Sequence, residues 1–266
     1  MKAPLIIDVH HHISDNPENW KELSAECSRL GIRKIICFGR NETTAKVMEK
    51  YPDLVVGFGM FNLGEDTVGK LDEFRHMGFR GVKFIRPLKN YDDKSFYPIY
   101  GRMEYYRLIA LFHLGIVSRL DSGLERYLDT NNNRHRPIYL DTIARAFPDL
   151  TIIGAHLGNP WYEEASMAAR WNKNLFFDLS GSTLKKKSSE FIGNLLWWKR
   201  DGQYSPHKQH AWEKIVFGSD VDINLIGDVL NDYRRVFQEL GLSEELQHQV
   251  LYGTMFKLLG FEDDVK

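Results

Sequence analysis

Three consecutive histidines, His10, His11 and His12, end the first apolar run of this 266-residue chain. In a β-strand alternate side chains share a face, so Asp8, His10 and His12 are expected to point one way and Val9 and His11 the other. Two neutral imidazoles about 7 Å apart in Cα position on a rigid strand suit a first-row divalent metal ion. Asp8, one step deeper, is placed to hold a ring N–H. The sequence therefore predicts His10 and His12 as metal ligands.

Two more polar residues close later apolar runs. His156 ends Thr151–His156 and Asp220 ends Ile215–Asp220, each with a glycine two residues earlier on the same face. An imidazole there can be a ligand or a general base, and a carboxylate can bind a metal through one oxygen and accept a proton through the other. The alternatives are a structural hydrogen bond for the histidine and a helix N-cap for the aspartate.

Short apolar or β-branched runs alternate along the chain with amphipathic segments of helical period. The predicted strands are Leu5–His11, Ile32–Phe38, Leu54–Phe61, Gly81–Ile85, Ile116–Asp121, Thr151–His156, Leu175–Leu179 and Ile215–Asp220, and the predicted helices include Trp20–Leu30, Thr67–Met77, Pro98–Leu114, Tyr139–Phe147 and Tyr162–Trp171. This alternation predicts an α/β fold, a (β/α)8 TIM barrel forming a single domain over residues 1–266, with its chemistry at the carboxyl ends of the strands. An open doubly wound sheet is the alternative, but it would not require the first and last strands to be neighbours, as a site combining His12 with Asp220 does.

The longest irregular segment is an insertion at about residues 181–212, between the seventh and eighth predicted strands. It carries Lys185–Lys187 and then Trp197 and Trp198. A long loop at this position of a barrel is expected to act as a lid or specificity element. Alternatively, the lysines form a solvated face and the tryptophans pack as structure or at a subunit interface.

Composition limits the partners. The formal net charge is −1, which offers no global field for nucleic acid or anionic lipid. Two cysteines cannot form a disulfide framework, and no stretch approaches the roughly 18 to 20 apolar residues of a membrane span. We expect a cytoplasmic protein that acts on a small molecule and contacts neither nucleic acid nor membrane.

The motifs at the strand ends occur in a defined order: His10-x-His12, Gly154-Ala155-His156-Leu157-Gly158, Phe217-Gly218-Ser219-Asp220, Leu251-Tyr252-Gly253-Thr254 and Leu258-Leu259-Gly260. In this order, over nearly the whole chain, the sequence resembles the amidohydrolase superfamily, most closely its amidohydrolase-2 branch with aminocarboxymuconate semialdehyde decarboxylase. The resemblance implies that His10, His12 and Asp220 bind a metal, that His156 acts on substrate or solvent, and that the chain forms a homo-oligomer.

One predicted position departs from that family. Many relatives have a metal-binding histidine at the end of the fifth strand, where the predicted strand here ends in Asp121. Asp121 can still be an oxygen ligand, but a carboxylate favours harder ions than an imidazole does. Zn is expected, with Mn or Mg as alternatives, and loss of the metal is a further possibility.

Three cations are predicted to bind the substrate: Arg119, Lys83 and Arg86. A barrel interior seldom accepts an unpaired cation, so Arg119 should meet a bound anion or pair with Asp121 or Asp178. The first reading implies a carboxylate-bearing substrate and the second a buried ion pair. Lys83 has a further alternative, a carbamylated ligand bridging two metals.

These residues together predict a metal-dependent hydrolase of a small substrate that uses a metal-activated water. His156 or Asp220 would direct that water at a carbonyl carbon. The alternative on the same scaffold is non-oxidative decarboxylation of an unsaturated or aromatic acid. A third possibility is a metal-free, non-catalytic binding barrel.

Overall fold

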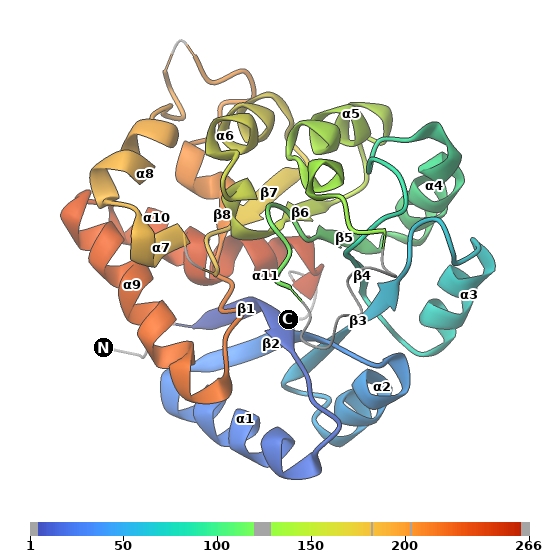
Figure 1. Ribbon diagram of the computed structural model, residues 1–266. Helices are drawn as coiled ribbons and strands as arrows, with labels where there is room; N and C mark the ends of the chain where they lie inside the picture. Colours follow the sequence, from blue (N-terminus) through green and yellow to red (C-terminus); the bar gives the residue numbers. More distant parts are fainter. Residues whose placement is uncertain (1–4, 120–128, 182, 203, 262–266) are drawn as a thin grey trace.

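The computed structural model describes residues 5–119, 129–181, 183–202 and 204–261. At its centre is an eight-stranded parallel sheet in the order β1 to β8, ringed by helices (Figure 1). The strands are β1 (Ile6–His12), β2 (Ile32–Phe38), β3 (Val55–Phe61), β4 (Gly81–Phe84), β5 (Ile109–Phe112), β6 (Ile152–Gly154), β7 (Leu175–Asp178) and β8 (Ile215–Val216). The α-helices are α1 (Pro17–Leu30), α2 (Asn41–Lys50), α3 (Gly69–His76), α4 (Tyr97–Tyr106), α5 (Ile138–Ala146), α6 (Tyr162–Trp171), α7 (Thr183–Lys186), α8 (Ser189–Leu195), α9 (Ile226–Glu239), α10 (Glu244–His248) and α11 (Thr254–Leu258).

Backbone hydrogen bonds close the sheet on itself. The amide of Val9 in β1 donates to the carbonyl of Phe217, just after β8, at 2.9 Å, and the amide of Asp220 donates to the carbonyl of His10 at 2.8 Å. The first and last strands are therefore neighbours. The prediction of a (β/α)8 barrel is confirmed, and the open sheet is excluded.

The strands are buried on both faces, as parallel barrel strands usually are. In β2, Ile36 and Phe38 belong to the core inside the barrel, whereas Ile35 and Cys37 belong to the core between strands and helices. Met255 and Leu259, at the chain's C-terminal end, pack into the inner core with Ile7 of β1. Since Ile7 lies near the start of β1, they fill the amino-terminal end of the barrel and leave its carboxyl-terminal end to polar side chains.

Local signals in the sequence set the limits of α1. The Asn16 side chain caps the helix by accepting from the amide of Glu18, and Pro17 fits the first turn because its missing N–H needs no partner there. Gly31 ends the helix in the left-handed conformation, with φ 79°. Leu23 and Cys27 face the barrel, so these caps fix where the helix packs.

The fifth strand is where sequence reasoning went wrong. The predicted strand Ile116–Asp121 is not a strand over its described residues, because β5 is Ile109–Phe112 and α4 ends at Tyr106. The helix stops at Arg107, which adopts φ 54° without being glycine. An apolar run as short as β5 fits either a helix or a strand, and no glycine marked the boundary.

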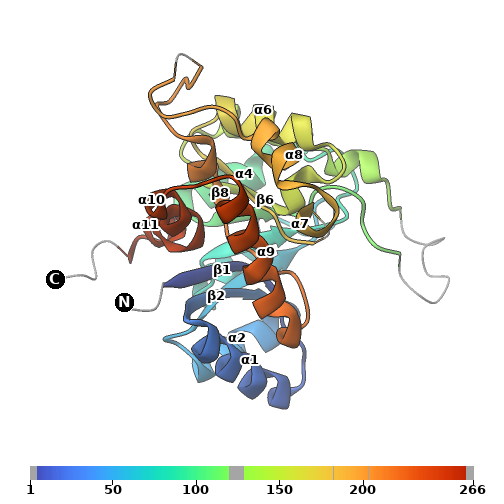
Figure 2. The ribbon, with the colours of Figure 1, turned by 90° about the vertical axis from the view of Figure 1, so that its left-hand side faces the viewer.

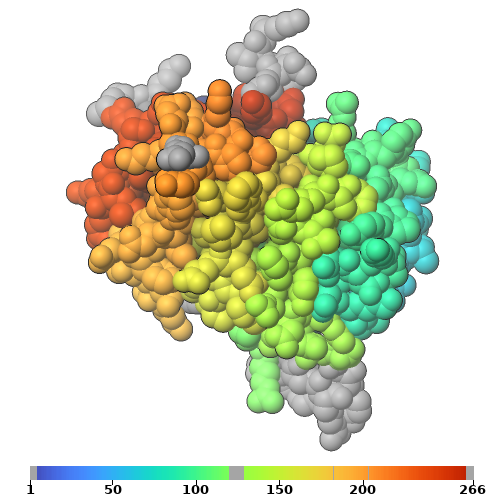
Figure 3. All heavy atoms as spheres, turned by 90° about the horizontal axis from the view of Figure 1, so that it is seen from above, coloured from blue at the N-terminus to red at the C-terminus, as the bar shows by residue number. Residues whose placement is uncertain are grey.

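The segment between β7 and β8 contains helices α7 and α8 and is therefore not irregular throughout. Seen from above, this segment lies beside α6, which in turn lies beside α5 (Figure 3). Trp198 and Trp212 are buried in the outer core, whereas Trp197 is about half exposed. The lid role of this segment stays a prediction. No helix in the described part of the chain is long and apolar enough to cross a membrane.

Candidate metal centre and active site

A β-bulge in β1 orients the histidine triplet. Between the pairs Asp8–Ile35 and His11–Cys37, β1 has one residue more than β2. The bulge breaks the two-residue alternation, so His10 reaches the barrel interior although its neighbour Val9 also faces it. Asp8 therefore does not hold an imidazole ring, which corrects the prediction.

Instead, Asp8 accepts backbone hydrogen bonds from the amides of His10 and Ser219, each at 3.0 Å. The bond from Ser219 joins β1 to the segment after β8, whereas the bond from His10 lies within β1. Burial raises the pKa of Asp8 to about 6, although the hydrogen bonds with Ser219 and His10 oppose the rise.

The predicted metal ligands converge at the carboxyl-terminal end of the barrel. Nε2 of His10 and Nε2 of His12 lie 3.4 and 3.5 Å from Oδ1 of Asp220. These three donor atoms, from β1 and from the segment after β8, form a set that can hold a metal ion. The His10 side chain is 1% exposed, whereas those of His12 and Asp220 are 57% and 22% exposed. One side of the set is therefore closed and the other is open.

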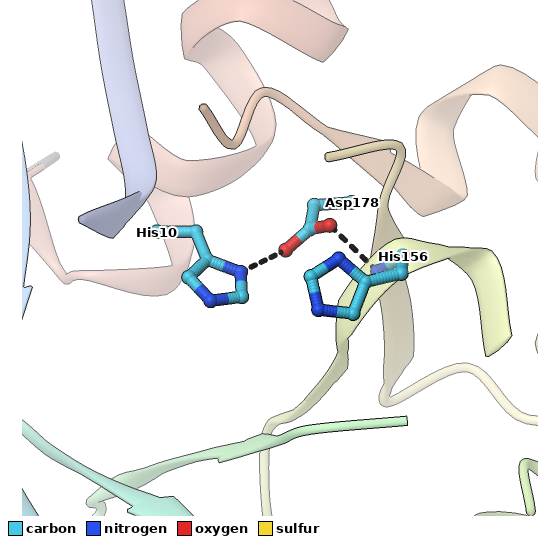
Figure 4. A group of neighbouring side chains, drawn as sticks. All are labelled: His10, His156 and Asp178. Carbon is cyan, nitrogen blue, oxygen red and sulfur yellow. Dashed lines mark hydrogen bonds and ion pairs between the residues drawn. The ribbon is translucent and has the colours of Figure 1, made fainter. Parts of the chain in front are cut away.

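Asp178, at the end of β7, lies on the closed side of this set and contacts both His10 and His156. Its Oδ2 lies 2.9 Å from Nδ1 of His10, and its Oδ1 accepts from the amide of His156 at 2.8 Å (Figure 4). Burial alone would raise the pKa of Asp178, but the charge and hydrogen bond of His10 hold it well below its usual range. Asp178 is therefore an ionised carboxylate that fixes the His10 ring through Nδ1, which leaves the His10 Nε2 lone pair for a ligand.

Ser180 extends this network to His156. Its hydroxyl donates to Oδ1 of Asp178 at 2.5 Å and lies 2.9 Å from Nδ1 of His156. Because the hydroxyl hydrogen is committed to Asp178, Nδ1 of His156 must carry the proton that Ser180 accepts. Burial lowers the pKa of His156 to about 4, so its ring is neutral and its Nε2 is a proton acceptor.

His156 and Asp220 face each other, with Nε2 3.6 Å from Oδ2 of Asp220. The backbones of both residues are left-handed, with φ 62° at His156 and φ 49° at Asp220. This conformation is uncommon for residues other than glycine. Burial raises the pKa of Asp220, but the neighbouring His10 and His156 outweigh it and lower the value. Gly218 lets these strand ends approach, since a Cβ there would lie 2.9 Å from Cβ of Asp178.

Lys83 lies beneath the same set. It projects from β4, is fully buried, and its ammonium lies 3.1 Å from Nε2 of His10 and 4.9 Å from the ring centre of Phe38. Burial lowers its pKa to about 8, against the opposing charges of Asp220 and Asp178. In this structure the Lys83 ammonium therefore contacts the ring of His10.

The end of the fifth strand carries His113, to which sequence reasoning assigned no chemistry. It follows Phe112 directly, its ring centre lies 5.0 Å from that of His156, and its buried Nε2 has no hydrogen-bond partner among the described residues. Burial lowers the pKa of His113 well below its usual value. His113, not Asp121, is therefore the residue at this strand end, and the apparent departure from the family pattern arose from the misplaced strand. Asp121 lies outside the described residues.

The other two cations predicted to bind the substrate, Arg119 and Arg86, do not form ion pairs with Asp178 in the described structure. Arg119 is exposed, and Asp178 pairs with His10 instead, so an Arg119–Asp178 pair is excluded. Arg86 follows β4 with φ 51°, its amide donates to Nε2 of His135 at 3.1 Å, and its guanidinium donates to the carbonyl of Ser118 at 3.0 Å. Arg86 is partly buried and stays near the barrel end.

A cleft of about 1000 Å³ opens beside His12 and Asp220. It runs between α1 and the turn that leads from β8 to α9, two elements that lie side by side in Figure 2. His11 lines the cleft, is 2% exposed, and has a buried Nδ1 without a hydrogen-bond partner in the described structure. Burial, aided by His10, lowers the pKa of His11 to about 4, and the charges of Asp220 and Asp222 oppose the shift.

A second set of potential metal ligands, His10, His156 and Asp178, fits an ion less well. Both oxygens of Asp178 already accept hydrogen bonds from His10, His156 and Ser180. An ion there would have to break this buried network, whereas an ion held by His10 Nε2, His12 Nε2 and Asp220 Oδ1 would displace the contact of Lys83 with His10 Nε2. Asp178 could have been recognised in the sequence, because it ends an apolar run just as Asp220 does.

A family model described as amidohydrolase matches residues 24–261. Among solved structures, an uncharacterised TIM-barrel protein from Bordetella bronchiseptica is similar at 18% identity with a TM-score of 0.71, over 96% of this chain and 98% of that chain. A 5-carboxyvanillate decarboxylase from Novosphingobium aromaticivorans, with bound manganese, is similar at 13% identity and TM-score 0.64, over 97% of both chains. A 4-oxalomesaconate hydratase from Rhodopseudomonas palustris has 16% identity and TM-score 0.61, over 97% of both chains. These likenesses concern the fold, and no curated protein matches the chain.

Proposed function

Because this chain belongs to the amidohydrolase family, we propose that it is a metal-dependent hydrolase of a small carbonyl substrate. The observation that carries the proposal is the convergence of His10 Nε2 and His12 Nε2 on Oδ1 of Asp220, at 3.4 and 3.5 Å. Two imidazoles and one carboxylate suit Zn, and Mn or Mg are the alternatives. Nε2 of His113, which has no hydrogen-bond partner among the described residues, offers one more donor at the same end of the barrel.

The residues around this donor set suit a bound divalent metal ion. His10 has its lone pair at Nε2 because Asp178 holds Nδ1, and Asp220 is ionised. Lys83 donates to the same Nε2, and its lowered pKa makes the neutral amine accessible once a divalent ion takes that lone pair. When bound, the ion would act as a Lewis acid on the carbonyl and lower the pKa of a water.

The protein's own groups then move the proton. Ionised Asp220 and the neutral Nε2 of His156, 3.6 Å apart, can share the proton that the attacking water releases. His156 can return that proton to the leaving nitrogen or oxygen as the carbonyl–heteroatom bond breaks. Ser180 and Asp178 keep the ring in the orientation that this requires.

We keep Arg86 as the residue proposed to bind a carboxylate of the substrate, since it stays near the barrel end and Arg119 is exposed. Lys83 is reassigned to the support of His10. Carbamylation of Lys83 remains testable by mass spectrometry of protein purified in bicarbonate, which would show an addition of one CO2.

The test is product analysis with metal-loaded protein on a panel of amides, lactones and unsaturated acids. A carboxylate released together with an amine or alcohol supports the hydrolase. Released CO2 would establish the decarboxylase instead. In the His156→Asn variant we expect turnover to fall at least about 100-fold while the metal content stays, because asparagine cannot transfer the proton. Metal lost together with activity would make His156 a ligand.

A further inference from the structure

One polar atom lies on the otherwise apolar face that α9 buries against the rest of the protein. The buried residues of α9 recur at spacings of three and four and are Ile226, Val229, Leu230, Tyr233, Val236 and Phe237. Of these, Tyr233 carries a hydroxyl, and it is 0% exposed. Its ring contacts those of Phe217 and Phe237, with ring centres 5.0 and 6.1 Å away. Because a buried hydroxyl needs hydrogen-bond partners, those of Tyr233 indicate what its side chain does there.

The Tyr233 hydroxyl connects the ends of β7 and β8. It accepts from the amide of Leu179, just after β7, at 2.8 Å and from the amide of Gly218, beyond β8, at 3.4 Å. It donates to the carbonyl of Val216, the last residue of β8, at 3.2 Å. The hydroxyl therefore uses its donor and both of its lone pairs. Burial and the charge of Asp178 raise the pKa of Tyr233 well above its ordinary value, so the donated proton stays on the oxygen.

These hydrogen bonds lie where the two strands separate. The last paired residues of β7 and β8 are Asp178 and Val216. Beyond this pair the segment after β8 bonds to β1 instead, since the amide of Asp220 donates to the carbonyl of His10. The hydroxyl of Tyr233 thus joins the two strand ends next to the residues that reach the metal centre.

The position of His10 depends on the separation of these strand ends. Asp178 of β7 contacts its Nδ1 at 2.9 Å, and Asp220, beyond β8, lies 3.4 Å from its Nε2. The imidazole therefore lies between two carboxylates that come from different strands. A change in the separation of the strand ends would move one carboxylate relative to the other, and a rigid ring cannot keep both contacts.

We propose that Tyr233 is a positioning residue of the metal centre, whose hydroxyl fixes the separation of the β7 and β8 ends and thereby places Asp178 and Asp220 on the two sides of His10. The hydrogen bonds described for Tyr233 go to backbone atoms, so it acts through the two strands. The inference rests on the proposed function in taking His10 and Asp220 as metal ligands. It extends the support of the metal centre to a helix outside the barrel.

The test is Tyr233→Phe, which removes the hydroxyl and keeps the ring. Titration of the full-length protein with Zn should show an affinity lower by roughly 10-fold or more, the effect typical of losing a partner behind a metal ligand. In metal-free protein, the NMR resonance of the Nδ1–H proton of His10 should shift, since the hydrogen bond to Asp178 is no longer held at one length.

Tyr100→Phe is the matched control. Tyr100 is also 0% exposed, and its hydroxyl donates to the carbonyl of Tyr91 at 2.6 Å, outside the metal centre. This variant should lose stability in urea unfolding because it loses a buried hydrogen bond. It should keep the Zn affinity and the His10 resonance of the wild type, which a merely structural role of Tyr233 would also leave unchanged in Tyr233→Phe.

Wild-type Zn affinity in folded Tyr233→Phe, or an equal loss of affinity in Tyr100→Phe, would overturn the proposal. If Tyr233→Phe does not fold, 3,5-difluorotyrosine at position 233 replaces it. Its oxygen is a poorer acceptor, so the affinity should fall to an intermediate value, and an unchanged affinity would contradict the proposed role.

The outcome for Tyr233 is separate from the outcome for the hydrolase. A protein whose Zn affinity depends on the Tyr233 hydroxyl but which hydrolyses nothing keeps this proposal and removes the hydrolase. A protein that hydrolyses a substrate and binds Zn equally well without the hydroxyl keeps the hydrolase and removes this proposal. If the wild type binds no metal, the His10 resonance in the two variants decides.

Discussion

The two sides of the metal centre differ in how their polar atoms are held. On the closed side, Asp178 binds His10 directly and reaches His156 through Ser180, and all four side chains are buried or nearly so. On the open side, His12 is 57% exposed, and Nδ1 of His11, which lines the cleft beside it, has no hydrogen-bond partner among the described residues. The closed side fixes ring orientation before any ligand arrives, and the open side leaves its donors for the ligand.

Removing the charge of Asp178 should have the largest effect. Asp178→Asn should lower the free energy of unfolding of metal-free protein by about 3 to 5 kcal/mol, because it breaks a buried charged network. Metal affinity should fall roughly 10- to 100-fold, since the His10 ring loses its support. Urea unfolding and metal titration measure both. Glu18→Gln, on an exposed surface, is the control, and equal losses in both variants would show that the closed side has no special role.

The buried cation on the closed side predicts a pH dependence. The pKa of Lys83 is lowered from 10.5 to about 8, so between these values the unfolded chain binds a proton that the folded chain does not. Stability contributed by Lys83 therefore rises with pH over this window, by an amount on the order of 3 kcal/mol. In Lys83→Met that rise should disappear, and urea unfolding of metal-free protein at pH 8 and pH 10 compares the two proteins. An identical pH dependence would show that Lys83 is not a buried cation.

Single histidine variants separate the two sides. His10→Ala and His12→Ala should both abolish tight metal binding, because each removes one of the three convergent donors. Only His10→Ala should also destabilise metal-free protein, by roughly 2 to 3 kcal/mol, since it leaves Asp178 buried without that hydrogen bond. His12→Ala should cost less than about 0.5 kcal/mol, as expected of an exposed side chain. Thermal unfolding measures the stability of each variant, and elemental analysis measures its metal content. A similar loss of stability in both variants would contradict the difference proposed between the closed and the open side.

The smallest effect is expected at Ser180. Ser180→Ala removes the acceptor for Nδ1–H of His156, at a cost of about 1 kcal/mol. Nitrogen NMR of the His156 ring should show a single Nδ1–H tautomer in the wild type and a mixture in the variant. A wild-type ring already present as a mixture would contradict the relay through Ser180.

Much of this site could be predicted from single residues at strand ends. Apolar runs ending in His12, His156 and Asp220 placed three side chains at one end of a barrel, because parallel strands in a closed sheet end at the same edge. The same rule applies to Asp178, which ends Leu175–Asp178, and would have identified it. His113 could not be found in this way, since the preceding run of four apolar residues suits a helix as well as a strand.

The orientation of side chains within β1 was beyond prediction. Strict alternation placed Asp8 behind His10, whereas the bulge turned Asp8 toward the segment after β8 and gave the His10 ring to Asp178. The bulge arises because β2 has one residue fewer than β1 between two paired positions. No residue type in β1 indicates such a bulge in the sequence.

The sequence by itself determined the order of strands and helices, the barrel, and the approach of His10, His12, His156 and Asp220, because periodicity and chain order are local properties. Only the tertiary structure decided which carboxylate holds His10, which histidine ends β5, and that a cleft lies beside the metal centre. The support of His10 depends on a contact between residues 168 positions apart, His10 and Asp178, and β5 depends on its pairing with β4 and β6. Such contacts exist only after the barrel has formed.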